Sequence, residues 1–211
     1  MSSPYPLKLK RFKKKSGIDF TLTSFRLSFH IPILLLGLVL LKDYFGIGLN
    51  INDAGFLCIC CYLGGFIWGR REQEHKHGEF NGHVEFSKEG FNTDSKVLLW
   101  SETEIAALKS SHVFRDDIYS HMNMLGPKYS LGVDNFIEFK TGNETGRVYF
   151  QFSDYKDKRK FEKIIRDQFY KGNIDLSVAY DGLSLTYEEI QVLKEEAKSK
   201  KNNANQQQYL Q

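Results

Sequence analysis

The chain has 211 residues and a formal net charge of +3, from 29 Lys and Arg residues against 26 Asp and Glu residues. So small a basic excess argues against a nucleic-acid partner. All three cysteines, Cys58, Cys60 and Cys61, lie inside one apolar run, and this excludes a disulfide-stapled secreted domain.

The basic residues gather at the amino terminus. The stretch KLKRFKKK, residues 8–15, carries six of them, and no acidic residue precedes Asp19. We interpret residues 1–16 as a basic tail on the cytoplasmic side of a membrane, where each Lys or Arg near an anionic leaflet contributes about 1 kcal/mol.

Two apolar runs follow the tail. The first, HIPILLLGLVLL at residues 30–41, reaches only about 18 Å as a helix, against a hydrocarbon core of about 30 Å. Its extension back to Phe20 reaches about 33 Å if Arg26 snorkels to the interface. The second run, residues 51–69, is comparable, although Asn52 and Asp53 lie in its first turn. We therefore predict a transmembrane hairpin over residues 17–69, with spans at 20–41 and 51–69.

The distribution of basic residues predicts the orientation of this hairpin. Six precede the first span and Arg70, Arg71 and Lys76 follow the second, whereas only Lys42 lies in the connection. The positive-inside rule then indicates a multi-pass protein of the bacterial inner membrane with both termini in the cytoplasm. A cleaved signal peptide and a pair of buried core helices are the alternatives.

Small residues mark one side of the second run. Gly65 and Gly69 have the spacing that lets helices approach closely, either in a homodimer or in packing against the first run near Gly37. Cys58 and Cys61 face the same way on a helix, and we interpret them as small hydrophobic residues rather than a thiol site.

Residues 70–172 change to strand periodicity and then to helix periodicity. Apolar alternation predicts strands around Val84 and Phe86, and over 97–100, 103–114, 135–140 and 146–152, with a hairpin loop at 141–146. A helix is predicted to begin after Ser153 or Asp154, either of which can cap it, and to end before Gly172. Its apolar stripe comprises Phe161, Ile164, Ile165 and Phe169. Antiparallel strands closed by one amphipathic helix suggest a small barrel of the pleckstrin-homology (PH) type.

These segments resemble the bacterial YcxB-like family, in which a transmembrane hairpin precedes a PH-like barrel. The resemblance covers about residues 17–172 and rests on four stretches: GIDFTLTSFRLSF, VEFSKEGF, LLWSETEI and FQFSDYKDKRKFEKIIRDQF. Two features depart from the pattern: an insertion at residues 115–133, and a closing helix where only Phe161 and Phe169 replace the usual tryptophan. The fold class expected is therefore an α+β membrane protein, with a two-helix transmembrane hairpin and a PH-like antiparallel β-barrel closed by an amphipathic helix.

Residues 173–211 form the last predicted segment. Thr186 and Glu189 make a capping box, and Leu185 and Ile190 have the spacing of a hydrophobic staple, so we expect an accessory helix over about 186–199. The composition of the remaining residues predicts a disordered tail. The helix either docks on the barrel or inserts into a groove of a partner.

Two clusters invite a chemical interpretation. His75, His77 and His83 with Glu79 could supply metal ligands, but the spacing matches no zinc pattern and solvated histidines explain it better. Asp116, Asp117 and His121 could perform acid–base chemistry, but no nucleophile or substrate site accompanies them. We predict no catalytic residue, no metal site and no cofactor.

The function expected from these features is that of a membrane-anchored, non-catalytic binding or scaffolding module. Its protein partner would contact an exposed sheet edge, the groove beside the 161–169 helix, or the 115–133 insertion, and a homodimer would form through Gly65 and Gly69. A ligand-sensing effector that oligomerises through its spans is one alternative. An enzyme that uses the loop of Asp116, Asp117 and His121 is the other.

Overall fold

The computed structural model describes residues 6–16, 24–46, 51–69, 71–93, 96–118 and 128–208. The chain divides into two compact units. The sheet unit comprises Met1–Lys15, Gly78–Phe114 and Gly132–Gln211, and the hairpin unit comprises Ser16–His77 and Arg115–Leu131. Both segments of the hairpin unit are therefore insertions into the chain of the sheet unit.

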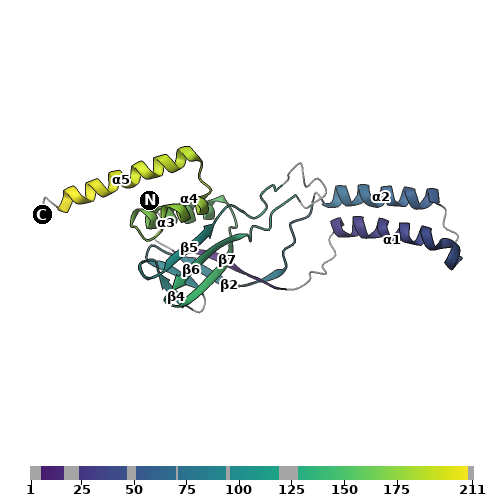
Figure 1. Cartoon of the computed structure of the whole chain (residues 1–211), viewed down its shortest axis with the longest axis horizontal. Coiled ribbons are helices and arrows are strands. Elements are labelled where there is room, and N and C mark those ends of the chain that lie inside the picture. Colours follow the sequence, from purple (N-terminus) through teal and green to yellow (C-terminus); the bar gives the residue numbers. More distant parts are fainter. Residues whose placement is uncertain are drawn as a thin grey trace. The chain divides into compact units, whose positions relative to one another are not determined.

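Two apolar helices, α1 (Ser24–Phe45) and α2 (Ile51–Gly69), pack side by side in the hairpin unit (Figure 1). Ala54 is buried, and Cys58 and Cys61 are half-buried, so one row of small residues at alternating spacings of four and three lies against the neighbouring helix. The thiol of Cys58 lies 3.8 Å from the carbonyl oxygen of Pro32 in α1. We call this row, Ala54, Cys58 and Cys61, the seam of the hairpin.

No helix within the described ranges combines the length and the apolar character that crossing a bilayer requires. The predicted transmembrane spans at 20–41 and 51–69 are therefore wrong, and so is the multi-pass inner-membrane localisation. The reason lies in how the apolar runs are interrupted: α1 begins only at Ser24, and its stretch between Arg26 and Lys42 extends only about 22 Å. In α2, Asn52 and Asp53 occupy the first turn. Residues 17–23 and 47–50 of the predicted hairpin lie outside the described residues.

The sheet unit is built on seven antiparallel strands in the order β4-β3-β2-β1-β7-β6-β5. The strands are β1 (Leu7–Lys14), β2 (Gly78–Phe86), β3 (Gly90–Thr93), β4 (Lys96–Leu99), β5 (Glu104–Lys109), β6 (Asn135–Thr141) and β7 (Glu144–Gln151). A strand lies in each stretch of residues 70–152 where one was predicted, but β3 was not predicted, β5 ends at Lys109 and not at residue 114, and β7 begins at Glu144 inside the predicted 141–146 loop. The closed PH-like barrel is wrong. The edge strands β4 and β5 share no ladder in the described part of the chain, so the sheet is open.

The basic amino-terminal segment lies in the middle of this sheet. β1 pairs with β2 on one side, from Leu7 opposite Phe86 to Lys14 opposite Gly78, and with β7 on the other. Leu7 and Leu9 are buried, whereas Lys8 and Lys10 between and beyond them are exposed. The stretch predicted as a tail is thus a central strand in which Lys8 and Lys10 project from the face opposite to that of Leu7 and Leu9.

Helix α3 (Tyr155–Tyr170) covers the inner face of the sheet, which we define as the face that carries Val84, Phe86 and Phe150. Its Phe161 ring packs against the rings of Phe86 and Phe150, at 4.9 and 5.1 Å between centroids. The predicted start and end of this helix are confirmed. Asp154 Oδ1 accepts a hydrogen bond from the amide of Asp157 at 2.8 Å, and Gly172 adopts a φ of 82° just after the helix.

Two more helices follow. Helix α4 (Leu176–Leu183), which the sequence did not predict, packs on β5. Helix α5 (Tyr187–Gln208) begins with the predicted capping box and buries Leu193, but it extends well past residue 199, where its end was expected. Tyr170 of α3 donates a hydrogen bond to Glu196 of α5, so the two helices are joined by a polar contact as well.

Candidate functional site

The acid–base loop is only partly described. The backbone carbonyl of Asp116 accepts a hydrogen bond from Ser130 at 2.8 Å, and the carboxylate of Asp117 lies 3.5 Å from the ammonium of Lys128. His121 lies outside the described residues. The described contacts thus tie Asp116 and Asp117 into the hairpin unit.

The histidine cluster yields no metal-ligand geometry. Among the residues that the structure describes, no group of three or more His, Cys, Asp or Glu side chains could hold a metal ion. Glu79, one of the proposed ligands, instead pairs with Lys15 at 2.8 Å, and this ion pair lowers the pKa of its carboxyl group. His83 lies in β2 opposite Lys10.

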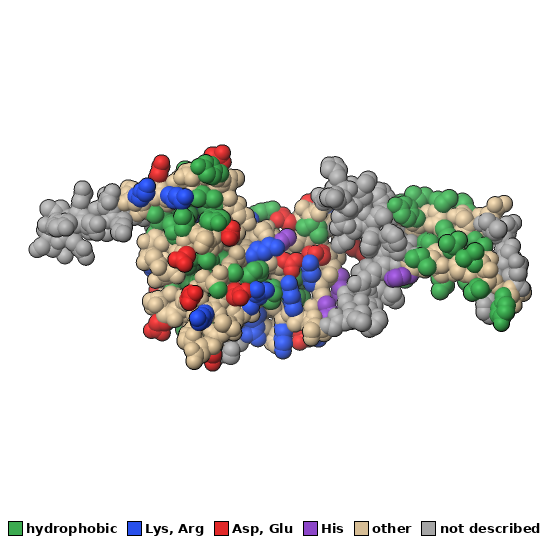
Figure 2. All heavy atoms as spheres, in the orientation of Figure 1, with side chains coloured by type: hydrophobic (Ala, Val, Ile, Leu, Met, Phe, Trp, Pro, Cys, Tyr) green, Lys and Arg blue, Asp and Glu red, His purple; other side chains and the backbone are tan. Residues whose placement is uncertain are grey.

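The surface of the helical hairpin is apolar. Phe56 of α2 is 68% exposed and Leu40 of α1 is 77% exposed, and Figure 2 shows apolar side chains over the visible surface of both helices. On α2, exposed side chains recur at spacings of four and three: Phe56, Cys60, Leu63 and Ile67. On α1, exposed side chains also recur at such spacings: Ile33, Leu36, Leu40 and Tyr44. We call these two rows the outward stripes.

The outward stripe of α2 lies on the opposite side of the helix from the seam, because residues 54 and 56 are about 200° apart at 3.6 residues per turn. The seam is covered by α1 and the stripe is not. A helix that is apolar on both sides needs an apolar environment on both sides. Within the described hairpin unit, the seam of α2 lies in an apolar environment and the outward stripe does not.

Glycines of the hairpin are a second, independent indication that its outer surface packs against another helix. A Cβ atom added to Gly37, Gly55 or Gly64 would meet nothing within 4 Å, so the packing of α1 against α2 does not require a glycine at any of these positions. Glycine in a helix interior costs about 0.5–1 kcal/mol relative to alanine. Gly64 lies one turn from Cys60, beside the outward stripe of α2. Gly65 and Gly69 also lie in α2, but their surroundings are outside the description.

A cavity of about 290 Å³ lies in the sheet unit between the β3–β4 and β6–β7 hairpins. Its apolar lining comes from Leu98, Phe139 and Val148, and its polar lining from Arg11, Thr93, Lys96, Glu144, Thr145 and Arg147. Two contacts bring the hairpins together: the rings of Phe91 and Phe139 are 5.4 Å apart, and Lys96 Nζ lies 2.6 Å from Glu144 Oε2. The sheet thus curls around the cavity although its edges do not pair.

Arg11 contributes its side chain from the inner face of the sheet. It lies opposite Phe150 in the β1–β7 ladder, and side chains of directly opposed residues share a face. Its Nε donates a hydrogen bond to the carbonyl of Asn81 at 2.8 Å, which fixes the plane of the guanidinium. The alternation of Leu7, Leu9 and Arg11 in the sequence could have predicted that these three side chains share one face of a strand. The prediction was missed because residues 1–16 were interpreted as a tail.

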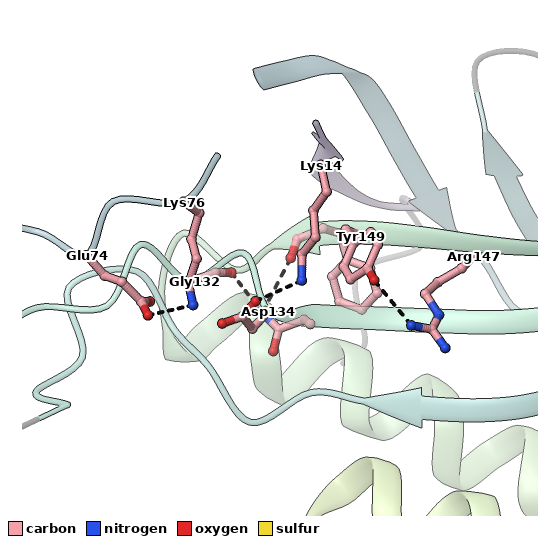
Figure 3. A network of polar contacts seen from close by, with 9 residues as sticks. Lys14, Glu74, Lys76, Gly132, Asp134, Arg147 and Tyr149 are labelled. Atoms are coloured by element: carbon pink, nitrogen blue, oxygen red, sulfur yellow. Dashed lines mark hydrogen bonds and ion pairs between the residues drawn. The ribbon is translucent and has the colours of Figure 1, made fainter. Parts of the chain in front are cut away.

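The outer face of the sheet carries a paired network (Figure 3). Lys14 Nζ lies 3.2 Å from Asp134 Oδ1 and 4.2 Å from the centre of the Tyr149 ring. Arg147 donates to the hydroxyl of Tyr149 at 3.3 Å and pairs with Glu138, and these bonds raise the pKa of the guanidinium. In the hairpin unit, Glu74 and Lys76 form a separate pair at 2.6 Å. Lys14 and Arg147 are thus each paired with a carboxylate.

The predicted partner surfaces are also placed by the structure. The edge strand β4 exposes Val97 and Leu99, and the 161–169 segment lies in α3, whose inner side is occupied by the sheet. Of the 115–133 insertion, residues 115–118 and 128–131 belong to the hairpin unit, where Tyr129 bridges to Gln73 and Asp117.

No family model, curated protein or solved structure matches the chain.

Proposed function

We propose that this protein is a non-catalytic assembly module in which two copies join through the outward stripes of α1 and α2. The observation that carries the proposal is the double-sided apolar character of the hairpin: its seam is covered, and its outward stripes are not. Large contiguous apolar surfaces on a folded chain mark interaction sites.

A second copy is the occupant that the hairpin surface fits best. Residues 31–41 and 54–68 contain no charged side chain, so the stripes offer no charge pattern that would select a different partner. Spacings of four and three are those of helices that pack as knobs into holes, and two helical hairpins with such stripes form a four-helix bundle. Twofold symmetry brings the same stripe from both copies together.

The glycine at position 64 supports the same arrangement. In the single hairpin, a side chain at this position would point into open space, so its absence is unexplained by intramolecular packing. A neighbouring helix backbone that approaches α2 beside the outward stripe would explain it, since small residues permit close approach. The earlier alternative, packing of α2 against Gly37, finds no support because a Cβ at Gly37 also meets nothing within 4 Å.

The proposal is tested by sedimentation equilibrium of the full chain together with crosslinking through Cys60, which is exposed on the outward stripe. In a chain with Cys58→Ser and Cys61→Ser, a short bismaleimide should join Cys60 of the two copies. Phe56→Glu should weaken self-association at least about thirtyfold, as expected for a central contact worth 2 kcal/mol or more. Gly64→Leu should weaken it as well while leaving the helix content unchanged.

The matched control is Val192→Glu, which places the same charge at an exposed apolar side chain of α5. This variant should self-associate like the parent chain. A monomeric parent, equal weakening by Val192→Glu, open-ended aggregation without a defined stoichiometry, or a monomer that floats with lipid vesicles would each refute assembly through the stripes.

The alternative of a ligand-sensing protein is favoured by one specific observation, the lined cavity of the sheet unit. The enzyme alternative stays untested, because His121 lies outside the described residues.

A further inference from the structure

We propose that a second copy packs on α2 in the antiparallel sense, with Phe56 of each copy seated over Gly64 of the other and the twofold axis beside Cys60. This inference rests on the proposed assembly and specifies its geometry, which the apolar stripes alone leave open. Three observations carry it: the position of Cys60 in the helix, the match between one large exposed side chain and one exposed glycine, and the charges at the helix ends.

Cys60 is the middle residue of α2, which has 19 residues from Ile51 to Gly69. When two identical helices overlap completely in the antiparallel sense across a twofold axis, the middle residue meets its own copy. Every other residue then meets the one at equal distance on the opposite side of the middle. Cys60 is exposed on the outward stripe, as this contact requires.

Phe56 and Gly64 lie at equal distances from that middle residue. Phe56 precedes Cys60 by four residues and Gly64 follows it by four, so each lies about 6 Å from it along the helix axis, in one row. Phe56 is 68% exposed, whereas a Cβ atom at Gly64 would meet nothing within 4 Å. A row with a large ring at one end and no side chain at the other is complementary to its own reversed copy. The antiparallel contact therefore places a ring over a glycine twice.

The parallel sense lacks this complementarity. A twofold axis along the helices would set Phe56 against Phe56 and Gly64 against Gly64. Two rings would then meet at one level of the interface, and a gap would remain about 12 Å further along. Crowded and empty positions each cost free energy, so the two senses differ in packing although they bury the same stripe.

The charges at the ends of α2 favour the antiparallel sense as well. The helix has an acidic residue, Asp53, in its first turn, and Arg71 follows shortly after its end. Antiparallel packing brings the acidic start of one copy to the basic end of the other, whereas parallel packing brings like charges together. Residues 54–68 between these ends carry no charged side chain, so a complete overlap keeps the charges at the rim of the contact.

The first test measures which positions meet, since Cys60 meets its own copy in either sense and cannot distinguish them. Two full chains of different mass both carry Cys58→Ser, Cys60→Ser and Cys61→Ser. One also carries Phe56→Cys and the other Gly64→Cys. When they are mixed with glutathione disulfide, thiol–disulfide exchange should join position 56 of one chain to position 64 of the other and release two molecules of glutathione. Each chain alone should form at least about tenfold less dimeric disulfide, because its two cysteines lie about 12 Å apart along the axis and a disulfide requires Cα atoms within about 7 Å.

The second test exchanges the sizes of the two side chains and uses sedimentation equilibrium. Gly64→Phe should weaken self-association at least about tenfold, because the new ring meets Phe56 of the other copy, and Phe56→Ala should do the same by leaving a gap. The double variant places the new ring over the new small residue, so its self-association should return to within about fivefold of the parent chain. The matched control combines Gly64→Phe with Val192→Ala, a truncation of an exposed side chain of α5, and should show no recovery.

The outcomes separate this inference from the assembly on which it rests. Efficient disulfides in either chain alone would show parallel packing and overturn the inference. A dimeric parent chain with neither the mixed disulfide nor the recovery would also overturn it, while assembly through the stripes would stand. A monomeric parent chain would refute both. If the double variant does not fold, the disulfides of the mixed chains decide the question alone.

Discussion

Asn135 holds His112 by both of its backbone groups. The side-chain Oδ1 of Asn135 accepts a hydrogen bond from the amide of His112 at 2.9 Å, and its Nδ2 donates to the carbonyl of the same residue at 2.6 Å. Asn135 is fully buried, and Nδ2 also donates to the carbonyl of Gly132 at 2.9 Å. One side chain thus fixes the segment after β5 against the start of β6.

Asn135→Ala should therefore be strongly destabilising. The substitution leaves the half-buried amide and carbonyl groups of His112 without this partner, and the free energy of unfolding should fall by about 2–4 kcal/mol. Urea unfolding followed by circular dichroism measures the change. Asn92→Ala, at an exposed position of β3, is the control and should change the value by less than about 0.5 kcal/mol. Equal effects of the two substitutions would contradict the role of Asn135.

Gly182 allows α4 to lie against β5. A Cβ at this position would meet Leu108 Cδ2 at 2.5 Å, and the Gly182 carbonyl accepts a hydrogen bond from Ser110 Oγ. Gly182→Ala should cost about 1–3 kcal/mol of unfolding free energy because the helix must move outward. Gly37→Ala, in open space within α1, should not destabilise. Thermal unfolding of both variants would distinguish close packing from a general effect of alanine.

Trp100 and Gln168 hold one turn of the chain from two elements. Trp100 Nε1 donates to the carbonyl of Ser87 at 3.0 Å, and Gln168 Nε2 donates to the carbonyl of Lys88 at 2.9 Å. Trp100→Phe keeps an aromatic ring beside Phe91 and removes the donor, so the unfolding free energy should fall by about 1–3 kcal/mol. Hydrogen exchange should also become faster at Gly90, after the turn. Unchanged exchange there would show that the indole bond does not hold the turn.

The capping box of α5 should respond to acid. The amide of Thr186 donates to Glu189 at 2.8 Å and lowers the pKa of the glutamate carboxyl group. The unfolded state therefore binds this proton at a higher pH than the folded state, and the stabilisation is present above the ordinary pKa and is lost as the pH falls through the lowered value. Amide exchange at the start of α5 should accelerate below about pH 4. In Glu189→Gln, which keeps an acceptor, this acceleration should be absent.

The contact between α3 and α5 should respond to base. Burial, and the hydrogen bond to Glu196, raise the pKa of Tyr170 to about 12. The folded state keeps its proton while the unfolded state loses it near pH 10, so this contribution to stability is lost between about pH 10 and pH 12. The difference in stability between the parent chain and Tyr170→Phe should shrink over that interval. A difference that stays constant would show that Tyr170 ionises as freely in the folded chain as in the unfolded one.

Features that depend on neighbouring residues were predictable from the sequence. The cap at Asp154, the positive φ at Gly172 and the capping box of Thr186 and Glu189 each involve residues within a few positions of one another, and each is confirmed. The strand alternation of residues 135–152 is confirmed for the same reason. The resemblance to the YcxB-like family stays a prediction.

Features that depend on distant partners were not predictable in this way. In β1, Lys8 and Lys10 alternate with Leu7 and Leu9, and only the strands on either side show that the leucines belong to a core. Whether β4 pairs with β5 likewise depends on the curvature of the whole sheet, and no local sequence pattern predicts it. The cavity was missed because its lining comes from separate strands, and because Arg11 was assigned to a tail.

The pairing of β1 with β7 has a consequence for how the chain reaches its native state. Of the seven strands of the sheet, β1 is made first, and it is completed on one side by Phe150 and its neighbours, about 140 residues later. Until then, one edge of β1 has no neighbouring strand, and Leu7 and Leu9 are not covered from the side of β7. Long loops must close before such contacts form, so folding of the sheet unit should be slow, and the segment that contains β1 should be a natural substrate for chaperones until β7 has been made.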